Sequence, residues 1–99
     1  MKKRKFEITM RVPTGIKYGT LTFEENSGNI NGSLDILRHK NTISGTVSAD
    51  GRIYFAGEIV TPVRTFAYEA CGSISGKTLS AEINGEHISC TVSGREVSL

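Results

Sequence analysis

Ile30-Asn31-Gly32-Ser33-Leu34 is the first of four pentads in which a glycine stands at the centre of an apolar-x-Gly-x-apolar pattern. The other three are Ile43-Ser44-Gly45-Thr46-Val47, Phe55-Ala56-Gly57-Glu58-Ile59 and Ala70-Cys71-Gly72-Ser73-Ile74. Successive side chains of a β-strand point to opposite faces, so each glycine shares a face with its two apolar neighbours. The pentads therefore predict four strands that each carry a glycine on the side facing the core.

Glycine in the interior of a strand is unfavourable and needs a structural reason. It lowers stability by roughly 0.5–1 kcal/mol relative to alanine, so four such glycines give up roughly 2–4 kcal/mol of a total of about 5–15 kcal/mol. The usual reasons are strong local coiling, a β-bulge, or the close approach of another backbone. A small closed or nearly closed β-barrel requires all three of these features.

Alternation of apolar and polar residues continues along the whole chain and predicts eight strands joined by turns of about two to five residues. The expected strands are Lys5–Val12, Lys17–Glu25, Asn29–Leu37, Thr42–Ser48, Arg52–Val60, Val63–Ile74, Thr78–Ile83 and Glu86–Val92. Asn84-Gly85 is typical of a type I′ turn, and Thr61-Pro62 is expected to form a tight turn that pairs Val60 with Val63. Gly94–Leu99 is expected to be a short terminal strand or a frayed end.

The predicted connections are too short for a crossover, so the strands must form an antiparallel up-and-down meander. Eight strands of this kind can close into a barrel whose interior holds side chains or one small ligand. The fold class is therefore all-β, with one domain over residues 5–99. By strand count this architecture resembles the lipocalin-like and streptavidin-like barrels, although the chain has no tryptophan and thus lacks the Gly-x-Trp opening of lipocalins.

The net charge of +2 is unevenly distributed, because Lys2, Lys3, Arg4 and Lys5 supply +4 and leave −2 for the remainder. Such a run could bind nucleic acid in the manner of an OB-like domain, because each basic contact to phosphate releases counterions. The other basic residues are scattered among acidic ones and do not form a positive face. We therefore expect residues 1–4 to be a flexible basic tail and do not expect nucleic acid as a partner.

The segment Phe6–Arg11 alternates and carries charges where a secretion signal needs a continuous apolar run. This pattern predicts a cytoplasmic protein without a membrane partner. Cys71 and Cys90 lack metal-ligand spacing and are interpreted as small sheet residues, so neither a metal nor another cofactor is expected. Glu58 and Glu69 point outward from neighbouring strands and are not expected to pair, and no other catalytic arrangement is evident. The sequence therefore predicts a protein that is not an enzyme.

Two neighbouring strands, Arg52–Val60 and Val63–Ile74, break the otherwise polar pattern of the outward faces. Their outward residues form a mostly apolar patch: Tyr54, Ala56, Val60, Val63 and Ala67. Exposed apolar patches on small domains mark partner surfaces, and the commonest partner is a second copy of the chain. Our leading hypothesis is a non-catalytic, homo-oligomeric binding or accessory module, with a dimer formed through this patch.

The inward faces of the same strands combine Phe55, Phe66 and Tyr68 with small residues such as Gly57 and Ala70. Large residues opposite glycines can interlock and fill the core. Alternatively, the missing side chains leave a pocket in which the Tyr68 hydroxyl is the polar group of an apolar site. The alternative hypothesis is therefore a calycin-like barrel that binds a small hydrophobic ligand through Phe55, Phe66 and Tyr68.

Overall fold

The structure is a computed structural model that describes residues 2–13, 15–36, 39–60, 63, 65–86 and 89–98, with the side chains of residues 2, 59 and 60 outside the description. It contains eight strands, β1 (Lys2–Val12), β2 (Gly15–Asn26), β3 (Asn29–Ile36), β4 (His39–Val47), β5 (Arg52–Val60), β6 (Thr65–Ser75), β7 (Thr78–Gly85) and β8 (Ser89–Val97).

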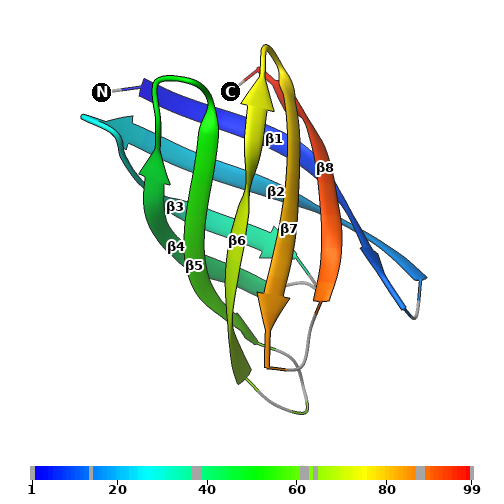
Figure 1. Ribbon diagram of the computed structural model, residues 1–99. Helices are drawn as coiled ribbons and strands as arrows, with labels where there is room; N and C mark the ends of the chain where they lie inside the picture. Colours follow the sequence, from blue (N-terminus) through cyan, green and yellow to red (C-terminus); the bar gives the residue numbers. More distant parts are fainter. Residues whose placement is uncertain are drawn as a thin grey trace.

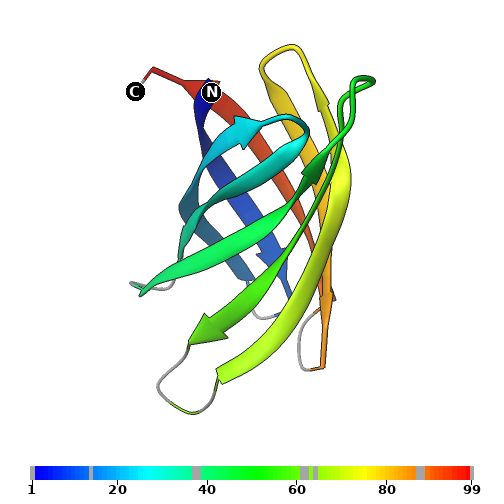
Figure 2. The same cartoon turned by 90° about the vertical axis from the view of Figure 1, so that its left-hand side faces the viewer.

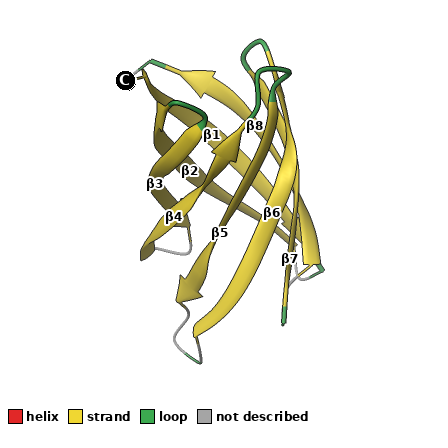
Figure 3. Ribbon diagram, turned by 60° about the vertical axis from the view of Figure 1, so that its left-hand side comes forward, coloured by secondary structure: helices red, strands yellow, loops and turns green. Residues whose placement is uncertain are grey.

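The strands form one closed antiparallel barrel in sequence order, in which β8 pairs with β1. The all-β meander predicted from alternation is thus confirmed. The barrel is elongated, with principal extents of 36 × 22 × 20 Å. Strands β1–β3 cross steeply behind β5–β8, and the two termini lie at the same end (Figure 1). The views in Figures 2 and 3 show a wall made of strands and their connecting loops.

The pentad glycines lie where the backbone of a neighbouring strand comes too close for any side chain. A Cβ atom added to Gly45 would overlap the Tyr54 carbonyl oxygen and lie 2.6 Å from the Phe55 Cα. A Cβ on Gly32 would overlap the Thr22 carbonyl oxygen and lie 2.5 Å from the Phe23 Cα. Close approach of another backbone is therefore the reason for these glycines.

Each of the four pentad glycines stands beside a large inward residue of a neighbouring strand. In the register of the sheet, Gly32 pairs with Phe23, Gly45 with Phe55, Gly57 with Tyr68, and Gly72 with Ile53. Ile8 pairs with a glycine on both sides, Gly19 in β2 and Gly94 in β8. The fully buried side chains form a continuous core: Phe6, Met10, Leu21, Phe23, Ile30, Leu34, Ile36, Ile43, Ile53, Leu79 and Ile83.

Two predicted turns were wrong in their register. Val60 pairs with Thr65 and not with Val63, and Asn84 pairs with Ser89, so Asn84-Gly85 is no two-residue turn. Gly94 belongs to β8 and not to a separate terminal segment. The register differs from the predicted one by two residues at the first turn and by four at the second. Both shifts are even and so keep each side chain on its face, which lets pairing along the whole strand outweigh the local turn preferences.

The expected flexible tail was also wrong, because β1 already begins at Lys2 and the basic run pairs with β2. Arg4 lies on the same face as Phe6, and its guanidinium sits 5.1 Å from the Phe6 ring centroid. Arg4 donates from Nε to Glu96 Oε2 at 3.0 Å and from Nη2 to Glu96 Oε1 at 2.8 Å. Hydrogen bonding to Glu96 raises the pKa of Arg4 further, and Glu25 also contributes. This ion pair joins β1 to β8 at the end of the barrel that holds the termini.

Gly45→Ala is expected to destabilise the protein strongly, by about 2 kcal/mol or more, because the added methyl group must displace the backbone of β5. Ser44→Ala, the adjacent exposed position on the same strand, should change the free energy of unfolding by less than about 0.5 kcal/mol. Urea denaturation followed by circular dichroism measures both. Equal effects of the two substitutions would contradict the proposed role of backbone approach.

Arg4→Ala is expected to lower the free energy of unfolding by about 1–3 kcal/mol, because the partly buried Glu96 carboxylate loses its bidentate hydrogen bonds to the guanidinium. Lys3→Ala changes the neighbouring basic residue, whose side chain is exposed, and should change stability by less than about 0.5 kcal/mol. Chemical denaturation of both variants tests this. If both substitutions lower the free energy of unfolding by the same amount, the contact of Arg4 with Glu96 does not stabilise the barrel and the basic run behaves as a solvated tail.

Candidate functional site

The three residues predicted to bind a ligand face the barrel interior from two adjacent strands. Phe55 in β5 and Tyr68 in β6 are 3% and 2% exposed, and Phe66 is partly buried against the same core. The rings of Phe55 and Tyr68 meet edge to face, with centroids 6.3 Å apart and an interplanar angle of 86°. The structure thus brings Phe55 and Tyr68 into direct contact and places Phe66 two residues from Tyr68 on the same inner face. Whether they bind a ligand stays a prediction.

The Tyr68 hydroxyl is a buried polar group without a hydrogen-bond partner among the described residues. It lies over the backbone of Gly57, since a Cβ added there would be 3.3 Å from this oxygen and 3.4 Å from Ile43 Cγ2. Burial raises the pKa of Tyr68 well above its ordinary value, so the phenol stays a neutral donor at any physiological pH. An unpaired buried hydroxyl costs about 1–3 kcal/mol, which makes this position energetically unusual.

Asn41 adds a second polar side chain to the interior, and the sequence analysis missed it. It is 5% exposed, and its Nδ2 donates to the carbonyl oxygens of Leu34 and His39, each at 3.3 Å. Asn41 precedes the predicted strand Thr42–Ser48, but β4 begins at His39 and includes it. Extending the inward alternation of Ile43 back by two residues would have identified it. Ile43 pairs with Gly57, and Gly57 with Tyr68, so Asn41 lies one inward position farther along, away from the termini.

Of the residues predicted to form an oligomer interface, Tyr54, Ala56 and Ala67 lie on the outer face of β5 and β6. Val63 lies in the connection between these strands, because β6 begins at Thr65 and not at Val63 as predicted. Val63 is 82% and Tyr54 41% exposed, Ala67 is exposed, Ala56 is half-buried, and the Val60 side chain lies outside the described residues. Glu58 pairs with Ala67, and Glu69 pairs with Ala56, so two exposed carboxylates interrupt this surface. Desolvation raises the pKa of Tyr54. The carboxylate of Glu69, which accepts a hydrogen bond from the Tyr54 hydroxyl, raises this pKa further. The patch is therefore mixed in character, and dimerisation through it stays a prediction.

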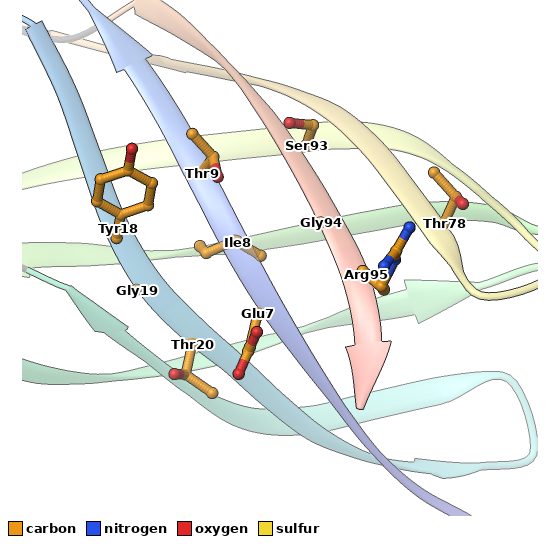
Figure 4. Close-up of a pocket in the computed structure, with 10 residues that line it drawn as sticks. All are labelled: Glu7, Ile8, Thr9, Tyr18, Gly19, Thr20, Thr78, Ser93, Gly94 and Arg95. Carbon is orange, nitrogen blue, oxygen red and sulfur yellow. The ribbon is translucent and has the colours of Figure 1, made fainter. Parts of the chain in front are cut away.

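A polar groove lies on the outer wall across β2, β1, β8 and β7 (Figure 4). It is open to solvent and has a volume of about 760 Å³. Its lining includes Tyr18, which is 74% exposed, together with Glu7 and Arg95. The sequence analysis did not identify this site, because its residues come from both ends of the chain and meet only through the β1–β8 pairing.

Neither a metal site nor a membrane-spanning helix is found in the part of the chain that the structure describes. No group of three or more His, Cys, Asp or Glu side chains is placed there to hold a metal ion. No described segment forms a helix long and apolar enough to cross a membrane. Burial raises the pKa of the Cys90 thiol, and Cys71 is exposed.

Comparison with known proteins supports the fold. No family model matches the chain, and no curated protein sequence matches it. The solved structure of a redesigned β-barrel, mFAP1, bound to DFHBI is similar, with a TM-score of 0.62 and 14% sequence identity. The match covers 95% of this chain and 92% of that one. At this identity the likeness concerns the barrel fold alone.

The wild-type protein is expected to lose stability at alkaline pH because of Tyr68, and Tyr68→Phe should remove this loss. Above about pH 10 the unfolded chain releases the phenolic proton while the folded protein retains it, so the free energy of unfolding falls as pH rises. The contribution of this one residue approaches about 1.4 kcal/mol per pH unit. The variant should lack it and be at least as stable as wild type at neutral pH, because an unpaired hydroxyl is removed.

The measurement is urea denaturation at several pH values from about pH 9 to about pH 11, a range that spans the ordinary tyrosine pKa. Tyr18→Phe is the matched control, since that side chain is 74% exposed, and it should keep the wild-type slope. Identical pH slopes for wild type and Tyr68→Phe would show that the Tyr68 hydroxyl is not buried in the folded protein.

Proposed function

We propose that this protein is a non-catalytic binding protein that takes a small, mainly apolar molecule into the barrel, with a hydrogen-bond acceptor directed at the Tyr68 hydroxyl. The observation that carries the proposal is the buried, unpartnered Tyr68 oxygen over Gly57. Buried hydroxyls of folded proteins are nearly always hydrogen-bonded, so an unpaired one indicates a site for a partner such as a water molecule or a ligand.

The surroundings of Tyr68 define the chemical class of that ligand. The aromatic side chains of Phe55 and Phe66 and the methyl groups of Ile43 provide apolar contacts, and the neutral phenol provides one donor. A carbonyl, ether or ring nitrogen on an otherwise apolar molecule matches this arrangement. The barrel mFAP1 is bound to DFHBI, which supports the view that a chain of this fold and length can bind a small molecule.

The position of the Tyr68 hydroxyl along the barrel indicates the end at which the ligand would bind. Arg4 and Glu96 occupy the end that holds the termini, where Arg4 Nη2 also donates to the carbonyl oxygen of Gly76 at 3.2 Å. Tyr68 lies near the start of β6, whereas Gly76 follows its end, so the two features are at opposite ends of the strand. We therefore place the ligand toward the end of the barrel away from the termini.

Homodimerisation through the β5–β6 face is a less favoured function. In a two-fold dimer the same patch meets itself, so Glu58 and Glu69 would approach their own copies or be desolvated. Light scattering at micromolar concentration tests it, and a single species of 10.7 kDa would exclude a stable dimer. Nucleic-acid binding has less support still, because Arg4 is directed to Glu96. Two acidic residues, Glu24 and Asp35, stand among the lysines of the adjacent outer groove, which are Lys3, Lys5 and Lys40.

Acetophenone and cumene provide a matched test, because they have nearly the same shape and only acetophenone offers a carbonyl acceptor. We expect acetophenone to bind wild-type protein about three- to tenfold more tightly than cumene, the value of one net hydrogen bond. In Tyr68→Phe the preference should reverse in favour of cumene, because the acetophenone carbonyl would then be buried without a hydrogen-bond donor. Titrations followed by amide NMR shifts give both the affinity and the location, which should include Gly57 and Tyr68.

Tyr54→Phe serves as the control, because it removes a hydroxyl from the outer face and should preserve the preference for acetophenone. Equal affinities of the two compounds for wild type would overturn the role of Tyr68. Binding of neither compound, with no thermal stabilisation by DFHBI, would overturn the proposed interior site.

A further inference from the structure

The groove on the outer wall is bounded by two rows of outward side chains that the closed barrel brings together. In one row Thr20, Glu7, Arg95 and Thr78 are neighbours across β2, β1, β8 and β7. In the other row Tyr18, Thr9 and Ser93 are neighbours across β2, β1 and β8. Gly19, Ile8 and Gly94 lie between the rows, as Figure 4 shows.

The glycines of this middle row explain why the wall is hollowed here. A Cβ on Gly19 would overlap the Asp35 carbonyl oxygen, and one on Gly94 would lie 2.9 Å from Ile8 Cγ2 and 3.1 Å from the Glu7 carbonyl oxygen. Neighbouring atoms therefore leave no room for a side chain at either glycine beside Ile8, whose own side chain is 3% exposed. Glycine at a strand interior commonly marks a bend or a site of close approach. The hollow is a consequence of the barrel's coiling and is built into the backbone.

The chemistry of the lining is that of a site for a neutral, hydroxyl-rich molecule. Four hydroxyl side chains, Thr9, Thr20, Thr78 and Ser93, can each donate and accept a hydrogen bond. Glu7 and Arg95 are register partners across the β1–β8 pair, so the groove carries one acidic and one basic side chain. Figure 4 shows the Glu7 carboxylate directed toward Thr20 and the Arg95 guanidinium toward Thr78. A charged ligand would gain little from such a pair, whereas a ligand with adjacent hydroxyl groups can bond to both members.

Tyr18 supplies the flat apolar surface that a sugar ring needs. It is 74% exposed at the edge of the groove. The face of an aromatic ring is negatively polarised and attracts the positively polarised C–H groups on the flat side of a pyranose. Ile16, on the same face of β2 and 52% exposed, extends this apolar edge.

We propose that this groove is a carbohydrate-binding site, in which one pyranose unit of a neutral saccharide stacks on Tyr18 and its hydroxyls bond to Glu7, Arg95 and Ser93. The two rows are two residues apart along each strand, about 7 Å, which matches the width of one sugar ring. The groove volume of about 760 Å³ leaves space for a second ring along the wall. This site is on the outside of β1, β2 and β8 and does not depend on a ligand at Tyr68.

The test is amide NMR of the full-length protein titrated with neutral saccharides up to about 10 mM, where single-ring contacts become measurable. The probes are methyl β-D-glucopyranoside, methyl α-D-mannopyranoside, cellotetraose and chitotetraose. We expect at least one of the four to shift the amides of Thr9, Tyr18, Gly19 and Gly94. Tyr18→Ala should weaken that binding about tenfold or more, whereas Tyr18→Phe should retain it, because the ring remains.

Tyr54→Ala is the matched control, because it removes the other exposed tyrosine from the opposite hairpin and should leave sugar binding unchanged. Thermal unfolding of each variant shows that the barrel is intact, and Glu7→Gln and Ser93→Ala should each weaken binding several-fold without changing the melting temperature. The proposal is overturned if none of the four saccharides shifts these amides, if the shifts lie elsewhere, or if folded Tyr18→Ala binds as tightly as wild type.

Discussion

Close approach of neighbouring backbones at the inward glycines is the constraint on which this barrel depends. At Gly32, Gly45 and Gly72 the next strand occupies the space that a side chain would need, and a large residue stands opposite. The strands can therefore coil tightly enough for eight of them to close within 99 residues. The strand glycines do not weaken a core that would be better served by alanine, because at these positions a methyl group has no room.

Both candidate sites follow from this same constraint, on opposite faces of the wall. Inside, Gly57 leaves the space over which the Tyr68 hydroxyl lies, so a polar atom is buried without a partner among the described residues. Outside, Gly19 and Gly94 lie on either side of Ile8 and line the floor of the polar groove. The positions that let the barrel close are therefore also the positions at which a ligand can approach the backbone.

The two ends of the barrel differ in their electrostatics. Arg4, paired with Glu96 beside Glu25 and stacked on Phe6, ties β1 to β8 at the end that holds the termini. Toward the other end the interior polar groups, Tyr68 and Asn41, are neutral. Charged groups are much more costly to desolvate than neutral donors. For this reason we infer that the end with Arg4 and Glu96 joins the first strand to the last, and we propose that the ligand binds toward the end with Tyr68 and Asn41.

The sequence by itself determined the all-β meander, the eight strands and the inward position of Phe55, Phe66 and Tyr68. Apolar and polar residues alternate with a period of two within each strand, and this pattern does not depend on the other strands. It did not determine which residues pair. The register of Val60 with Thr65 and the place of Arg4 in β1 were settled by strand pairing and by Glu96, which is 92 positions away. The groove formed by Tyr18, Glu7 and Arg95 likewise appears only in the closed barrel. Closure joins the first strand to the last, and contacts across that seam depend on the shape of the whole chain, which no local pattern of residues encodes.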